Sequence, residues 1–325
     1  MNNIDLSNFM LRTDLIIENN NIKHDEKNID GISITTTKDN GNYITISFED
    51  VTDFENREKV GKVLENVLKD IINLNNINED ATCLVIGLGN IKSTPDSLGV
   101  KSIDDILVTS HLFEFGSVKD GIRKVSTFTP GVMANTGIES SKMISSIIKE
   151  IKPDFVIAID ALASLSIDRI NKTIQITDTG IHPGSGIGNN RLEISKKTMN
   201  IPVIAIGVPT VTSSTTIVYD TIKYLYKHIS YIKDNESISK LSYIKTNYKN
   251  KLKNKDLTEE EKQNLLGLFG ILSEKEQRSL INEVLTNTEL NLIVTPTEID
   301  FLIDKLSNLI ASSINNALHR QITHY

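Results

Sequence analysis

The feature that most constrains the fold is an uninterrupted apolar run that ends on a carboxylate. The string KPDFVIAIDALAS (152–164) leaves a charged turn, continues through the apolar residues Phe155–Ile159 and then reaches Asp160. A short apolar run bounded by turn residues is typical of a strand buried on both faces, as in the centre of a parallel sheet. Open α/β sheets bind their ligands at the carboxyl ends of such strands. Asp160 is therefore a candidate functional residue.

A second run of the same form precedes another aspartate. TCLVIGLGN (82–90) is followed by STPD, which ends at Asp96, so two carboxylates are expected at one edge of one sheet. Two carboxyl groups a few ångströms apart share a proton, and such a pair can activate water and protonate a departing amine. That chemistry is peptide hydrolysis without a metal or a covalent nucleophile. The alternative interpretation is structural: Asp96 caps a helix after Pro95, and Asp160 caps the next one.

Hydrophobic periodicity predicts the elements around these strands. Alternating residues predict a β-hairpin, apolar stripes predict helices, and a further apolar run predicts another buried strand. The predicted elements are a hairpin of Ile32–Thr37 and Tyr43–Phe48, a helix over Arg57–Leu74, a helix with a capping box at Thr136 and Glu139, a strand over Val203–Ile206, a turn at Val208–Thr210, and a last helix from Pro296 to about His319. Residues 231–291 are predicted to form a polar, lysine-bearing helical excursion. The class is α/β, with a helix-covered, mostly parallel sheet.

Composition excludes several kinds of protein. The 325-residue chain has a formal net charge of −7, whereas a nucleic-acid-binding protein needs a basic face. No apolar run reaches the ~18 residues of a membrane span. The N-terminus lacks the features of a signal peptide, so we expect a cytoplasmic protein. The single cysteine, Cys83, lies in an apolar strand and is expected to be a small buried hydrophobic residue.

A glycine-rich loop, GIHPGSGIGNN (180–190), supplies further candidates. His182, Gly184, Ser185 and Gly186 are candidate substrate-loop residues, because glycines permit a close backbone approach. The loop has no Lys-Ser/Thr ending and no nucleophile elbow, and VIGLGN has Lys92 where a dinucleotide fingerprint needs glycine. No cofactor is expected. A metal site of Asp96, Asp160 and His182 is the alternative, because carboxylate and imidazole groups suit zinc or another divalent ion.

Strings along nearly the whole chain resemble the germination protease of spore-forming bacteria. They are RTDL (12–15), VIGLGN and TPDSLG (85–99), ILVTSHLF (106–113), PGVMANTGIE (130–139), KPDFVIAIDALAS (152–164), TIQITDTGIHPGSGIGN (173–189), IPVIAIGVPT (201–210) and NALH (316–319). The resemblance implies an atypical aspartic endopeptidase, with Asp96 and Asp160 as the catalytic carboxylates. It also implies a fold similar to hydrogenase-maturation peptidases and assembly as a homotetramer.

The resemblance further implies a zymogen that removes its own N-terminus. The processing site falls on the bond between Asp14 and Leu15, so residues 1–14 would be a propeptide and residues 15–325 a single peptidase domain that includes the excursion. The implied substrates are the small acid-soluble, DNA-protecting proteins of the spore core. No direct contact with nucleic acid or membrane is implied.

Several positions depart from the family pattern. Arginine is usual where this chain has Ser110 and Leu165, tryptophan where it has Ile91, and an acidic residue where it has Ser213. Loss of a guanidinium next to Asp160 would alter how an acidic substrate is held. Two further hypotheses therefore stay open: a metal-dependent maturation peptidase of similar fold, and a non-catalytic spore protein that keeps the scaffold.

Overall fold

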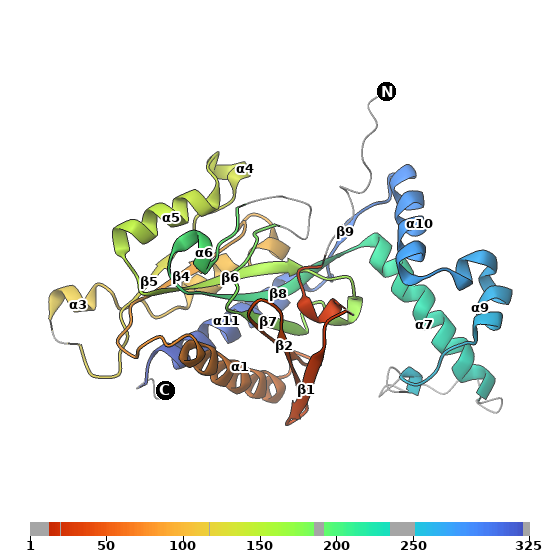
Figure 1. Ribbon diagram of the computed structural model, residues 1–325, viewed down its shortest axis with the longest axis horizontal. Coiled ribbons are helices and arrows are strands. Elements are labelled where there is room, and N and C mark those ends of the chain that lie inside the picture. Colours follow the sequence, from red (N-terminus) through yellow and green to blue (C-terminus); the bar gives the residue numbers. More distant parts are fainter. Residues whose placement is uncertain (1–12, 20, 117, 185–191, 235–250, 321–325) are drawn as a thin grey trace. The chain divides into compact units, whose positions relative to one another are not determined.

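The chain forms two compact units. The computed structural model describes residues 13–19, 21–116, 118–184, 192–234 and 251–320 (Figure 1). The larger unit falls within residues 11–211 and 295–325, and the described part of the smaller unit falls within residues 212–294. Among the helices of the described ranges, none has the length and apolar character that a bilayer crossing needs.

A sheet in the order β1-β2-β3-β7-β8-β6-β4-β5 forms the centre of the larger unit. The strands are β1 (His24–Ile29), β2 (Ile32–Lys38), β3 (Asn42–Ser47), β4 (Cys83–Gly87), β5 (Val125–Phe128), β6 (Phe155–Ala163), β7 (Thr173–Thr177) and β8 (Val203–Ser213). Strands β8, β6, β4 and β5 are parallel neighbours, and antiparallel pairing continues the sheet through β7, β3, β2 and β1. The predicted α/β class is confirmed, and its parallel half carries both candidate aspartates.

Helices cover both faces of the parallel strands (Figure 1). Helices α1 (Phe54–Leu74) and α11 (Ile299–Leu318) pack on one face, and α5 (Ser140–Ile151) and α6 (Lys196–Met199) on the other. Alternate residues of β6 serve the two layers, because successive side chains of a strand point to opposite faces. Ile157 and Ile159 belong to the first core, and Val156 and Ala158 to the second. This double burial explains why the sequence of β6 is continuously apolar.

The predicted hairpin is confirmed and gains a third strand. Strands β2 and β3 pair antiparallel around residues 39–41, as the alternating pattern indicates. Strand β1 precedes them and pairs with β2, and five of its six residues are exposed. The polar sequence HDEKNI gives no apolar alternation, so pairing with β2 rather than burial forms this edge strand.

Shorter elements connect these layers. They are η2 (Ile16–Glu18), η3 (Thr94–Asp96), α2 (Leu98–Asp104), α3 (Leu112–Phe115), α4 (Met133–Thr136) and η4 (Ile167–Arg169). Two local predictions are wrong. Thr136 ends α4, and Glu139 is the N-cap residue of α5, so no capping box joins them. Residues 208–210 continue β8 instead of forming a turn, and the pairing register between β6 and β8 shifts at Leu162/Ala163 beside Pro209.

The smaller unit contains α7 (Ser214–Asp234), α9 (Glu259–Leu266), η6 (Gly267–Ile271), α10 (Glu274–Asn287) and the short strand β9 (Ile293–Val294). Its first helix, α7, confirms the helix that the sequence predicts after residue 210 and up to about His228, and it continues to Asp234. The predicted excursion at 231–291 begins within α7, and its residues 235–250 lie outside the described ranges. The guanidinium of Arg278 bonds Glu274 at 2.8 Å, lies 3.8 Å from Asp220 and covers the ring of Tyr219. Burial is the largest cause that raises the pKa of Tyr219 to about 12.

A buried histidine in the larger unit makes its stability depend on pH. His319 is 3% exposed, and its Nδ1 accepts the backbone N–H of Arg123, which requires the neutral ring. Burial, with the Arg123 charge as a smaller cause, lowers the pKa of His319 below 6.5. The unfolded chain therefore binds this proton more tightly, so the stabilisation is complete above the unfolded pKa and is lost as the pH falls through the folded one.

We expect His319→Gln to flatten the dependence of the unfolding free energy on pH below about 6.5, by up to ~1.4 kcal/mol per pH unit. Urea unfolding between about pH 5 and 8 measures this slope. His111→Gln is the matched control, because His111 is exposed. If the unfolding free energy of His319→Gln changes with pH as steeply as that of the wild-type protein, the prediction is wrong.

Candidate active site

Asp160 lies inside β6, three residues before its end. The side chain is 4% exposed, and one carboxylate oxygen accepts the N–H of Ala161 at 2.9 Å. The strand continues to Ala163, so the prediction that it ends at Asp160 is wrong by three residues. A residue inside a strand cannot cap a helix, and the structural alternative for Asp160 is therefore excluded.

Asp96 is the last residue of the short helix η3, directly before α2. The N-cap residue of η3 is Ser93 and that of α2 is Ser97, so Asp96 is the N-cap of neither helix. Its backbone carbonyl accepts the N–H of Asn90 at 2.9 Å, which ties the turn to the loop that follows β4. The carbonyl of Pro95 accepts a hydrogen bond from the hydroxyl of Thr210 in β8 at 2.7 Å.

These contacts put both aspartates at the same edge of the sheet. The N–H of Leu88 donates to the carbonyl of Ile159 at 2.8 Å, so the exit of β4 lies beside the residue that precedes Asp160. Two residues later, Asn90 binds the Asp96 carbonyl. Helix η3 itself packs against β6. The structure therefore brings the Asp96 turn and Asp160 to the carboxyl ends of β4, β6 and β8, where ligands of α/β sheets bind.

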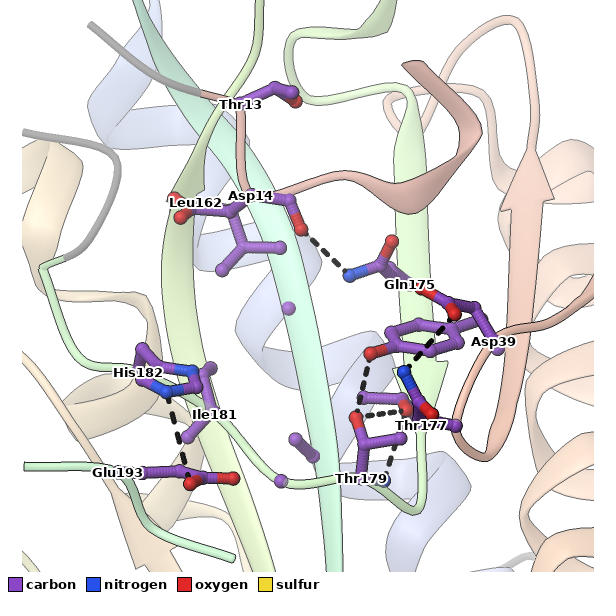
Figure 2. Close-up of a pocket in the computed structure, with 15 residues that line it drawn as sticks. Thr13, Asp14, Asp39, Leu162, Gln175, Thr177, Thr179, Ile181, His182 and Glu193 are labelled. Carbon is purple, nitrogen blue, oxygen red and sulfur yellow. Dashed lines mark hydrogen bonds and ion pairs between the residues drawn. The ribbon is translucent and has the colours of Figure 1, made fainter. Parts of the chain in front are cut away.

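A cavity of about 430 Å³ opens over β6, β7 and β8 beside this edge (Figure 2). Leu162 lines it from the same face of β6 as Asp160, because the two residues stand two apart in the strand. Gly207, whose Cα pairs with that of Asp160, lines it from β8. Other lining residues are Asp14, Tyr43, Gln175, Thr179, His182 and Glu193. Most of the lining residues have polar side chains, which can hydrogen-bond a peptide backbone.

The predicted processing site lies in this cavity. The backbone N–H of Asp14 donates to the carbonyl of Ala163 at 3.2 Å, and its carboxylate accepts the Ala163 N–H at 3.0 Å. The side-chain amide of Gln175 donates to the Asp14 carbonyl at 3.0 Å and accepts the N–H of Ile16 at 2.8 Å (Figure 2). Leu15 is 1% exposed. The segment on both sides of the Asp14–Leu15 bond is thus held by the end of β6 and the centre of β7.

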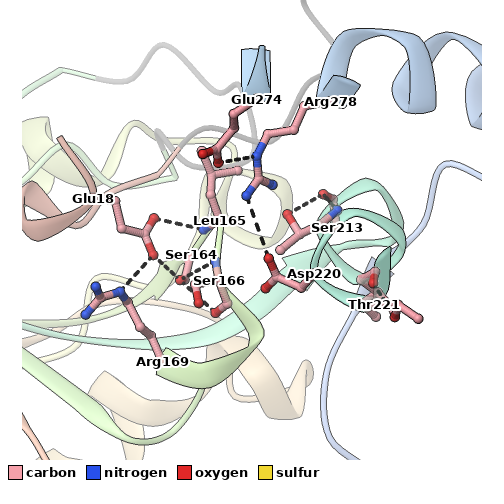
Figure 3. A network of polar contacts seen from close by, with 12 residues as sticks. Glu18, Ser164, Leu165, Ser166, Arg169, Ser213, Asp220, Thr221, Glu274 and Arg278 are labelled. Carbon is pink, nitrogen blue, oxygen red and sulfur yellow. Dashed lines mark hydrogen bonds and ion pairs between the residues drawn. The ribbon is translucent and has the colours of Figure 1, made fainter. Parts of the chain in front are cut away.

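A second acidic residue of this segment, Glu18, is bound just beyond β6 (Figure 3). Its carboxylate accepts the N–H of Leu165 at 2.9 Å and the hydroxyl of Ser164, and it lies 3.4 Å from Nε of Arg169. Leu165 thus contributes its backbone N–H, and Arg169 a guanidinium, to the binding of this carboxylate. The group around Arg278 in the same figure belongs to the smaller unit and is described above.

The other departures have separate local roles. The hydroxyl of Ser213 accepts the N–H of Thr216 at 3.1 Å, which satisfies a free donor in the first turn of α7. The N–H of Ser110 donates to the carbonyl of Val125 at 2.9 Å, a contact that any side chain at 110 permits. Ile91 is 54% exposed.

In the described part of the glycine-rich loop, His182 does not join the aspartates in a metal site. The exposed His182 faces Glu193, with 3.9 Å between Nε2 and the carboxylate, and both line the cavity (Figure 2). Within the part of the chain that the structure describes, no group of three or more His, Cys, Asp or Glu side chains is placed to hold a metal ion. The alternative site of Asp96, Asp160 and His182 is therefore not assembled. Gly184 lies at the described end of the loop, and Ser185 and Gly186 lie outside the described residues.

The sequence patterns missed Gln175, which makes two hydrogen bonds with the segment around Leu15. It is 6% exposed in β7, whose sequence is TIQIT. A lone amide in a buried strand is a usable signal, because buried polar groups need partners. Its partners, however, lie about 160 residues earlier in the chain, and no local pattern identifies them.

Comparison with known proteins gives a consistent result across the chain. The family model described as germination protease matches residues 6–325. The germination protease of Bacillus velezensis is 42% identical over 356 residues, covering 99% of this chain and 97% of that protein. The germination proteases of Priestia megaterium and Bacillus subtilis are 42% and 41% identical, each over 98% of this chain and 96% of the relative.

Among solved structures, the chain is similar to a [NiFe] hydrogenase maturation protease, HycI, from Thermococcus kodakarensis. The similarity has a TM-score of 0.28 and 20% sequence identity, and it covers 44% of this chain and 80% of that protein. At this level we draw nothing from it about fold or activity.

Proposed function

The chain belongs to the germination protease family, and from this premise we propose that it is an endopeptidase whose Asp96 and Asp160 activate water against peptide bonds. Its substrates are the small acid-soluble proteins of the spore core, which it degrades at germination. It is made as a zymogen, in which residues 1–14 are a propeptide and residues 15–325, spanning both compact units, form the mature peptidase. The mature protein assembles as a homotetramer.

One observation supports the proposal: the Asp96 turn and Asp160 lie at the same edge of the sheet, beside a cavity whose wall includes Asp14. One carboxylate takes a proton from water, whose oxygen attacks the peptide carbonyl carbon. The other group, as a carboxylic acid, gives its proton to the departing amine. Water is consumed, a new carboxyl and a new amine form, and the pair again holds one proton.

The acidic residues around Leu15 support a substrate class of the same chemistry. Asp14 precedes the bond and Glu18 follows it by four residues, and each carboxylate accepts a main-chain N–H at the end of β6. Arg169 adds a positive charge at Glu18. Charge-assisted hydrogen bonds of this kind favour substrates with carboxylates at both positions.

Intact-mass measurement of the full chain tests the proposal. We expect the wild-type protein to lose residues 1–14 and to acquire Leu15 as its N-terminus, both with and without a strong chelator. Asp96→Asn should stay intact, because an amide can neither take up nor release the proton. The processed wild-type protein should also cleave a purified small acid-soluble spore protein.

Asp104→Asn is the matched control, because Asp104 is an exposed carboxylate in α2, the next helix after Asp96. It should process at the wild-type rate. Normal processing by a folded Asp96→Asn protein would refute the carboxylate mechanism. Inhibition by the chelator would instead support a metal-dependent peptidase, and a wild-type protein that cleaves nothing would support the non-catalytic hypothesis.

A further inference from the structure

Gln175 is placed to contact the bond that is cleaved. It lies at the centre of β7, and its neighbours in the sheet are Thr45 of β3 and Gly207 of β8. The residue is 6% exposed, so its amide must find partners within the protein. Gly207 carries no side chain, and the Leu162 side chain packs over it. Gln175, Gly207 and Leu162 line the cavity together.

Both ends of the Gln175 amide bind one short segment, and Figure 2 shows the contact with Asp14. Nε2 donates to the carbonyl of Asp14 at 3.0 Å, and Oε1 accepts the N–H of Ile16 at 2.8 Å. The Asp14–Leu15 bond lies between these contacts. The amide thus binds the main chain as a neighbouring strand would, and it does so whatever side chains the segment carries. Side-chain selection falls to other groups, such as the Ala163 N–H at the Asp14 carboxylate.

We propose that Gln175 is a catalytic residue that holds and polarises the carbonyl group of the cleaved peptide bond. The inference rests on the proposed function, because it concerns the same bond and the same water. When the water oxygen bonds to the carbonyl carbon, the electron pair of the C=O bond moves to the oxygen. The Nε2–H of Gln175 stabilises that developing negative charge and then releases it as the C–N bond breaks and the leaving amine takes its proton.

The side-chain oxygen of Gln175 also restricts which substrates can bind. Oε1 needs an N–H two residues after the cleaved bond, as Ile16 provides. A substrate with proline or an N-methylated residue at that position would leave the buried Oε1 without its partner and would bind poorly. The same change one residue later, at the position of Ile17, does not involve Gln175.

Kinetics with the processed protein and a synthetic peptide of residues 9–22 test the inference. We expect Gln175→Leu and Gln175→Glu to lower kcat by about 100-fold or more, because each removes the donor, with a smaller change in KM. Gln175→Glu keeps an acceptor for the N–H of Ile16 and, at a pH where its carboxyl is ionised and has no donor, should bind the peptide better than Gln175→Leu. Methylation of the Ile16 nitrogen should raise KM more than methylation of the Ile17 nitrogen.

Thr45→Val is the matched control, because Thr45 pairs directly with Gln175 and its buried hydroxyl has no partner among the described residues. It should retain the wild-type kcat. If the Gln175 variants fold and keep kcat within about threefold of the wild-type value while Asp96→Asn is inactive, the inference is wrong and the proposed function stands. If Asp96→Asn is active, or the wild-type protein cleaves nothing, the proposed function fails and the inference fails with it.

Discussion

Asp160→Asn is expected to lower turnover by about a thousandfold or more and to leave the fold intact. Asparagine has the shape of aspartate, and its carbonyl oxygen can still accept the N–H of Ala161, the contact that orients the side chain in β6. It cannot exchange a proton with water. The variant should therefore lose its turnover but keep its stability, with the free energy of unfolding changed by only about 1 kcal/mol. Cleavage assays and urea unfolding on the same preparation measure both effects.

Asp154→Asn is the control for removing a carboxylate from the same part of the chain. Asp154 is exposed directly before β6, at the end opposite Asp160, and it accepts hydrogen bonds from the N–H and hydroxyl of Thr82. Its loss should cost about 1 kcal/mol of stability and no activity. If Asp160→Asn keeps more than a tenth of wild-type turnover, Asp160 is not the residue that exchanges the proton.

The sequence predicts most reliably the parts of the fold that are formed by burial. Strands β4 and β6 are apolar because both faces are covered, and that cause is visible in the residues themselves. Helix α1 shows its apolar stripe for the same reason, and its buried residues are the ones that the spacing indicates. The position of the ligand-binding edge then follows from the direction of the strands.

Elements formed by pairing were harder to predict. Strand β1 is polar and exists because β2 offers an unpaired edge. Strand β8 runs on past Pro209, where a turn was predicted, because the Pro209 carbonyl still accepts a hydrogen bond, from Asn171, and a shift of register in β6 accommodates the missing N–H. A local pattern reports the residue's own preference and not the bonds that a distant segment supplies.

In the candidate site, too, some residues could be predicted from the local sequence, whereas contacts between distant segments could not. Asp96 and Asp160 could be identified because each follows a buried strand in the sequence. The contacts of Gln175 with Asp14 and Ile16, and of Glu18 with Leu165, join residues about 150 apart, so only the folded chain reveals them. His182 was an attractive candidate by composition, but its ring faces Glu193 and does not join the aspartates in a metal site.

Gly89→Ala is expected to damage the site without removing any functional group. Gly89 has a φ of +109°, and a Cβ atom built on it would lie 1.9 Å from the Asp96 carbonyl oxygen. No rotamer relieves a clash with backbone, so the η3 turn must move and the Asn90–Asp96 hydrogen bond must break. We expect a loss of roughly 2–4 kcal/mol in unfolding free energy. Turnover should fall by at least about tenfold, since displacing a catalytic group by ~1 Å can cost 100-fold.

Gly31→Ala is the control for Gly89→Ala, because it introduces the backbone strain of a positive φ without a steric clash. Gly31 also has a positive φ, +87°, in the turn between β1 and β2, but a Cβ atom there would have no neighbour within 4 Å. That variant should lose only about 1–2 kcal/mol and keep full activity. The difference between the two variants then measures what the close approach of Gly89 to Asp96 contributes. Equal losses of stability, with full turnover by Gly89→Ala, would mean that the loop after β4 does not position Asp96 for catalysis.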